Sequence, residues 1–253
     1  MPSLAKPSTV LISAPSASTA KTIQEVLEKI PLEKRNQVTE ISMDMARNMG
    51  LAAEKSFPNS KHVIDRFHVV RLVMDAVQHI RINLRWKTIE DENIAIKQAK
   101  QNGEKYYSPI LANGDTLKEL LVRSRYLLYK YETDWTANQA KRAAILFEKY
   151  PALKTAYQLT LTFRNIYKNA SKTQALIEFN NWKQKVITAQ IDEFNTVVNS
   201  IDHHLDNIMN FFDNRSTNAN AESFNSKIKG FRANLRGVTD VKFFLFRLEK
   251  LFA

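Results

Sequence analysis

The sequence predicts an α/β layer joined to a larger all-helical part, in a chain that is helix-rich overall. Three observations lead to this prediction. Two short β-type runs alternate with helical runs between residues 20 and 85, and such alternation is typical of a parallel sheet. Only five glycines and seven prolines interrupt 253 residues, and this scarcity of breakers favours long helices. Finally, 44% hydrophobic residues suffice for a sizeable core.

The first elements come after an N-terminal stretch of low complexity. Residues 1–18 are rich in Ser, Ala and Pro, and we expect little order there apart from a possible strand at Thr9–Ser13. Apolar residues then recur at helical spacing over Thr19–Ile30, where Pro31 ends the run.

Two strands follow, and each ends at an aspartate. A strand is expected at Val38–Met43, directly before Asp44, and a second at His62–Ile64, directly before Asp65. A helix separates them, and another starts at residue 67 and runs to about residue 86. Active sites of parallel sheets lie at the carboxyl ends of the strands. The pattern therefore predicts both aspartates at a functional edge.

The middle of the chain carries helical periodicity throughout. The expected segments are Ile89–Gln101, Thr116–Tyr131, Trp135–Tyr150, Ala152–Lys168, Thr173–Ala189 and Ile191–Phe212. We therefore divide the chain into residues 1–18, a partial catalytic layer at 19–86, an all-helical insertion at 87–212, and C-terminal catalytic and closing helices at 213–253.

Composition narrows the class of protein. With no cysteine, disulfides and thiolate metal sites are excluded, and a cytoplasmic location is expected. No apolar run approaches the ~20 residues that span a bilayer. A net charge of +11 favours a polyanionic partner, usually nucleic acid, so association with the nucleoid is expected.

The helix expected after residue 218 is divided into two stripes. At 100° per residue its polar stripe begins with one carboxylate, continues with an amide and ends with cations. A solvated face is the ordinary explanation of such a stripe, and a metal-binding acid beside a phosphate backbone is the functional one. The apolar stripe is Ala221, Phe224, Ile228, Phe231 and Leu235; the polar stripe is Glu222, Asn225, Lys229, Arg232 and Arg236.

Three segments together carry a resemblance to a known family. They are Ile41-Ser-Met-Asp-Met45, Phe57-Pro-Asn-Ser-Lys-His-Val-Ile-Asp-Arg-Phe-His-Val69, and Asn218-Ala-Asn-Ala-Glu-Ser-Phe-Asn-Ser-Lys-Ile-Lys229. In this order they resemble bacterial DDE-type insertion-sequence transposases, over roughly residues 20–253. In that family an RNase H-like catalytic fold is interrupted by an all-helical insert before the last acid.

The resemblance implies a DNA-strand transferase that uses two divalent metal ions, Mg²⁺ or Mn²⁺, held by three carboxylates. One ion activates water or a 3′-hydroxyl, and the other stabilises the leaving oxygen. By motif position, Asp44 is similar to the second acid and Glu222 to the third, so both are expected to be catalytic metal ligands.

For other residues of the motifs, the sequence leaves more than one role open. Asp65 could be a metal ligand, a side chain that supports the ligands from outside, or the cap of the next helix. His68 could support the site or be structural, and Asn225 could orient Glu222 or bind the DNA backbone. Phosphate contacts are expected from Lys227, Lys229, Arg232 and Arg236.

The sequence departs from the family pattern at its first acid. No aspartate precedes Asp44, and we expect an N-terminally truncated copy that lacks the first catalytic Asp and is inactive alone. The expected partners are double-stranded DNA, as transposon ends and target, and further copies of the full-length form. The alternatives are a non-catalytic DNA-binding regulator of a full-length transposase, and a helical interaction protein whose basicity is incidental.

Overall fold

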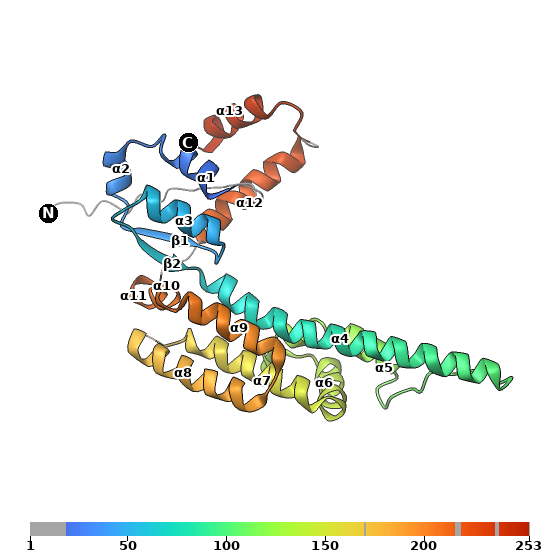
Figure 1. Cartoon of the computed structure of the whole chain (residues 1–253). Helices are drawn as coiled ribbons and strands as arrows, with labels where there is room; N and C mark the ends of the chain where they lie inside the picture. Colours follow the sequence, from blue (N-terminus) through green and yellow to red (C-terminus); the bar gives the residue numbers. More distant parts are fainter. Residues whose placement is uncertain (1–18, 170, 216–218, 236–237, 253) are drawn as a thin grey trace. The chain divides into compact units, whose positions relative to one another are not determined.

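A computed structural model describes residues 19–169, 171–215, 219–235 and 238–252. Side chains at positions 219–222, 225 and 252 are not among those described. The expected strand at Thr9–Ser13 therefore lies outside the described residues. The chain forms two compact units, one made of residues 1–65 and 215–253 and the other of residues 66–214 (Figure 1).

The first unit contains a small parallel sheet. Strand β1 (Glu40–Met43) pairs in parallel with β2 (Lys61–Ile64), with Glu40 opposite Lys61 and Met43 opposite Ile64. The parallel pairing expected from the sequence is thus confirmed for these two strands. The helices of this unit are α1 (Ala20–Leu27), α2 (Leu32–Asn36), α3 (Arg47–Ser56), α12 (Ala219–Asn234) and α13 (Val241–Phe252).

Helices α1 and α3 cover one face of this sheet. Ile23 and Leu27 of α1 form a buried cluster with Ala52 of α3 and Phe57, and Ile41 of β1 packs against it. The other face is buried too, since Val63 is 0% exposed. Burial on both faces is characteristic of parallel sheets.

The second unit is entirely helical in its regular elements. Its helices are α4 (Arg66–Gln101), α5 (Leu117–Arg123), α6 (Ala137–Lys149), α7 (Pro151–Ile166), α8 (Lys172–Ala189), α9 (Asp192–His203), α10 (Leu205–Met209) and α11 (Phe211–Asn214), with 3-10 turns η1 (Leu127–Tyr129) and η2 (Glu132–Asp134). Trp182 of α8 is fully buried at its centre and donates from Nε1 to the carbonyl of Leu159 on α7 at 2.9 Å.

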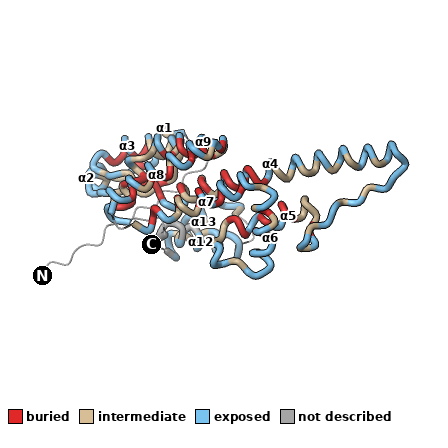
Figure 2. The backbone as a smooth tube through the Cα atoms, turned by 90° about the horizontal axis from the view of Figure 1, so that it is seen from below, coloured by how far each residue is buried: buried red, intermediate tan, exposed pale blue. Residues whose placement is uncertain are grey.

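Several boundaries in this unit differ from expectation. The segment expected at Thr116–Tyr131 is an α-helix only as far as Arg123, and the 3-10 turn η1 follows. Helix α4 does not end near residue 86 but continues to Gln101, because no glycine or proline interrupts it. Its first half is buried, whereas its second half is largely exposed (Figure 2), which weakens the apolar periodicity there. The segment Ile191–Phe212 is not one helix but three, with a break at His204, where the backbone leaves helical geometry at φ −112° and ψ 14°.

A buried aspartate joins α5 to α6. Asp115 is 1% exposed and accepts hydrogen bonds from Arg142 Nε and Asn113 Nδ2, both at 2.8 Å, as well as from Arg123. Burial opposes ionisation of Asp115, but the hydrogen bonds from Arg142 and Arg123 outweigh it and hold the pKa of the carboxyl below its usual value. This carboxylate therefore neutralises two arginines at the join.

Among the described residues, no helix is both long enough and apolar enough to cross a membrane.

Candidate acidic edge and basic helix

The two aspartates that end the strands lie at the same edge of the sheet. Met43 and Ile64 are paired in register, and Asp44 and Asp65 are the next residues of each chain segment. The backbone N–H of Asp65 also donates to the carbonyl of Met43 at 2.9 Å. The parallel arrangement thus brings both residues to the carboxyl edge, as the sequence predicted.

Asp44 is held in a turn that leaves half of its carboxylate available. Its Oδ1 accepts a hydrogen bond from the backbone N–H of Ala46 at 2.9 Å, a local bond that aspartate commonly makes two residues on. This bond fixes the path from β1 into α3. Within the described part of the chain, the other oxygen, Oδ2, has no hydrogen-bond partner, and the residue is partly exposed.

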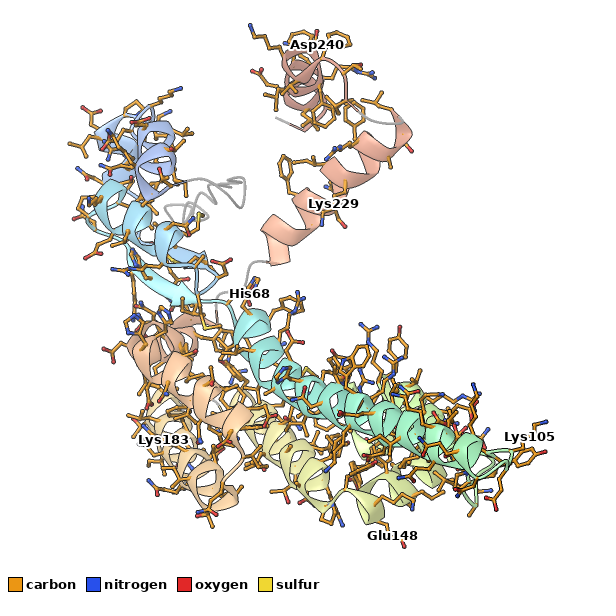
Figure 3. All side chains as sticks on the ribbon, turned by 45° about the vertical axis from the view of Figure 1, so that its right-hand side comes forward. His68, Lys105, Glu148, Lys183, Lys229 and Asp240 are labelled. Atoms are coloured by element: carbon orange, nitrogen blue, oxygen red, sulfur yellow. The ribbon has the colours of Figure 1, made fainter. Side chains whose placement is uncertain are left out.

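Asp65 is placed differently. It is only 4% exposed and directly precedes α4, which begins at Arg66. This position suits a helix cap, and it equally suits a carboxylate that supports the ligands from outside. His68 lies in the first turn of α4 (Figure 3), partly exposed, with its ring edge-to-face on Phe67 at 5.4 Å between centroids.

The sequence analysis did not single out a partly buried histidine on β2. His62 of β2 pairs in register with Ile41, on the sheet face that packs against α1 and α3. Burial lowers the pKa of His62, and the negative charge of Glu54 on α3 offsets this only in part. Burial therefore favours the neutral form of this imidazole.

The helix that carries Glu222 is α12. Its stripes differ in exposure: Phe224, Ile228 and Phe231 are partly buried, while the described cations Lys227, Lys229 and Arg232 are exposed. Glu222 and Asn225 belong to α12 by backbone, but their side chains are outside the described set. Arg236 lies outside the described residues altogether.

Helix α13 holds the apolar side of α12. Phe231 stacks on Phe244 at 5.6 Å between ring centroids, and the Arg247 guanidinium lies 5.0 Å from the Phe231 ring. The contact engages the apolar stripe of α12. Its cationic stripe remains accessible to a partner.

The donor chemistry at the sheet edge fits a hard divalent cation, because carboxylate oxygens are the ligands that Mg²⁺ and Mn²⁺ prefer. In the part of the chain that the structure describes, no three acidic, histidine or cysteine side chains converge on one point. Asp44 and Asp65 supply two carboxylates at this edge. The Glu222 side chain is outside the described residues.

The sequence analysis also missed a cluster of arginines in the helical unit. Arg81 and Arg85 are one turn apart on α4, and Arg125 follows α5. The spacing of Arg81 and Arg85, four residues apart on a helix, could have indicated that they share a face. The position of Arg125 depends on how α5 packs on α4.

Comparison with known proteins identifies the family. A family model described as a transposase matches residues 3–248. No curated protein and no solved structure matches the chain. Because the match extends over nearly the whole sequence, the chain belongs to the transposase family DDE_Tnp_ISL3.

Proposed function

We propose that this chain acts in DNA transposition through a divalent-metal site to which Asp44 and Glu222 contribute ligands, on a partial RNase H-like layer. Family membership makes it a transposase and makes DNA its partner. It also favours the transposase interpretation over that of a non-catalytic regulator. The residues that perform the chemistry are the part that we propose.

The observation that carries the proposal is the arrangement of Asp44. Parallel pairing of β1 with β2 directs it to the carboxyl edge of the sheet, which is where such folds bind their ligands. The bond from Ala46 orients Oδ1, and Oδ2 is left for another partner. An aspartate that only capped the turn would need the hydrogen bond from Ala46 but not the position at the carboxyl edge of the sheet.

Mg²⁺ or Mn²⁺ at this site would activate the attacking oxygen and stabilise the leaving oxygen at phosphorus. Asp44 and Glu222 would hold the ion, and Asp65 would support them from its buried position. Asn225 would orient Glu222.

The cations of α12 would bind the DNA backbone. Lys227, Lys229 and Arg232 are exposed on the helix that carries Glu222, and Arg236 continues the same stripe by sequence. Contacts of this kind position DNA without reading its bases. They would place a phosphodiester beside the acid of the same helix.

The helical part would be an insertion between the two acids. The proposed insertion at 87–212 lies wholly inside the compact unit formed by residues 66–214. The division of the chain supports this proposal, because residues 1–65 and 215–253, which flank the helical unit in the sequence, form one compact unit.

Strand transfer by this chain alone is not expected. The chemistry uses three carboxylates, and no aspartate precedes Asp44 to serve as the first. Two ligands would bind metal weakly and leave the nucleophile without a fixed position. We therefore propose that the chain binds metal and DNA but does not join DNA ends.

Metal binding tests the proposal without relying on activity. Mn²⁺ is titrated into the wild type and into Asp44→Asn and Glu222→Gln variants by isothermal titration calorimetry. Each substitution is expected to weaken Mn²⁺ binding about tenfold or more. The matched control is Asp75→Asn, which removes an exposed carboxylate that pairs with Arg71 on α4. Equal Mn²⁺ affinity in the Asp44→Asn variant and the control would refute the assignment.

A further inference from the structure

The helical unit carries an arginine cluster that the proposed site does not use. The Arg81 cluster consists of Arg81 and Arg85 on α4 and Arg125 just after α5. Arg81 donates from Nε to Gln78 Oε1 at 2.8 Å and from Nη1 to the Leu121 carbonyl at 2.9 Å. Gln78 in turn donates to the carbonyl of Arg125 at 3.0 Å. These bonds hold the Arg81 side chain against α5 and the backbone of Arg125 against α4.

The charge of this cluster is not neutralised within the described residues. None of the three guanidinium groups makes an ion pair there. The Nε of Arg85 is buried without a hydrogen-bond partner. Burial lowers the pKa of Arg81, and the charges of Arg125 and Arg85 lower it further. Asp115 in the same unit shows the contrast, because there two arginines share a carboxylate.

Exposed aromatic rings border the cluster. Trp86 is 59% exposed and Tyr126 is 66% exposed. The Arg85 guanidinium lies 5.6 Å from the Trp86 ring, and that of Arg125 lies 5.5 Å from the Tyr126 ring. Cation–π contacts at these distances restrain an arginine without neutralising it. Arginine next to exposed aromatic rings is typical of surfaces that bind nucleic acid.

We propose that the Arg81 cluster is a second DNA-binding surface, on α4 and α5, that contacts backbone phosphates independently of α12. Arg85 and Arg125 are the contacting groups, and buried Arg81 is a positioning residue. The planar guanidinium fork matches a phosphate with two parallel hydrogen bonds. A bound phosphate would also offset the repulsion among the three cations. The inference rests on the proposed function only in taking DNA as the partner.

The experiment measures affinity and its salt dependence by fluorescence anisotropy with a labelled DNA duplex and the full chain. The variant is Arg85→Gln/Arg125→Gln, which leaves Arg81 and its hydrogen bonds intact. Each lost phosphate contact lowers the slope of log Kd against log salt by about 0.9. We expect the slope to fall by about 1.8 and the affinity to fall roughly sixtyfold near 0.1 M salt. A duplex of scrambled sequence should show the same loss, because phosphate contacts do not read bases.

Two further variants keep the test specific. Lys154→Gln/Lys185→Gln removes two exposed cations of α7 and α8 that make no ion pair with any described residue, and it should change the slope by less than about 0.5. Arg85→Lys/Arg125→Lys retains both charges and should retain most of the slope. Circular dichroism and urea midpoints are measured for all variants. If the glutamine pair loses structure, the lysine pair is compared with Arg125→Gln alone.

The outcome also separates this inference from the proposed function. Lys227→Gln/Lys229→Gln is measured in parallel as the α12 variant. Loss of slope in the α12 variant alone overturns the second surface and leaves the proposed α12 contacts standing. Loss in the Arg81-cluster variant alone supports the second surface and refutes the α12 contacts. If the salt slope of Arg85→Gln/Arg125→Gln changes as little as that of the control Lys154→Gln/Lys185→Gln, the inference is overturned.

Discussion

Removing Asp115 should destabilise the helical unit more than removing any exposed carboxylate. The Asp115→Ala substitution deletes the carboxylate that pairs with Arg142 Nε at 2.8 Å, the one ion-pair partner of Arg142 among the described residues, and the Arg142 side chain is only 19% exposed. Loss of one partner of a buried ion pair costs about 3–5 kcal/mol. Because Arg123 is 51% exposed and keeps Glu119 as a partner, we expect the lower end, about 3 kcal/mol.

This magnitude can be measured directly. The free energy of unfolding is obtained from urea titrations at pH 7, followed by circular dichroism on the full chain. For a unit of roughly 150 residues, about 3 kcal/mol corresponds to a fall in Tm of about 6–12 °C. The matched control is Asp202→Ala, which removes the partner of Lys183 from a pair that is about one-third exposed, and it should cost less than about 1 kcal/mol.

The pH dependence gives a second check on the same residue. The pKa of Asp115 is lower in the folded chain than its ordinary value of 3.8. Its contribution is therefore complete above pH 3.8 and is lost as the pH falls through the lower, folded value. The stability gap between wild type and Asp115→Ala should persist from pH 7 to pH 5 and shrink below pH 4. A gap equal to that of the Asp202 control, or one that grows on acidification, would contradict the argument.

Three further predictions concern other parts of the chain. Trp182→Ala should lower the free energy of unfolding by about 3–5 kcal/mol, because the ring is fully buried and its Nε1 donates to the Leu159 carbonyl. In the same urea titration, Trp86→Ala should cost less than about 1 kcal/mol, because Trp86 is exposed. Thr116→Ala should cost about 1 kcal/mol by the loss of the capping box that it forms with Glu119 at the start of α5, measured as a shift in urea midpoint. The purified chain should not join DNA ends in Mg²⁺, and joined product on a gel would show that a third carboxylate is not required.

The strands and their parallel pairing could be predicted because the local signals agree there. The run that contains β1 and the run that contains β2 are short, β-prone and followed by Asp44 and Asp65, and a helix lies between them. The edge that brings the two aspartates together follows from this topology alone. Helix α2 was not predicted, because it is only five residues long and starts after Pro31, where the sequence had indicated a stop.

The limits of the long helices were harder to predict, for a physical reason. The continuation of α4 beyond residue 86 was predicted as a separate helix at Ile89–Gln101, because its exposed second half carries only a weak apolar stripe. The break at His204 occurs without glycine or proline. The Arg81 cluster depends on tertiary packing, because Arg125 follows α5 and comes close to α4 through the fold, where its carbonyl accepts a hydrogen bond from Gln78. Catalytic roles for Asp44 and Glu222 stay predictions that the metal titration decides.

The discontinuity of the first unit has a consequence for biosynthesis. Residues 1–65 leave the ribosome before the helical unit, and their partners at 215–253 leave after it. At about 5–20 residues per second, roughly 150 intervening residues impose a delay of about 7–30 s. During this time residues 66–214 can fold, while residues 1–65 are still without the C-terminal part of their compact unit. A nascent chain stalled after Asn214 should therefore show a protease-resistant helical fragment and a sensitive N-terminal one.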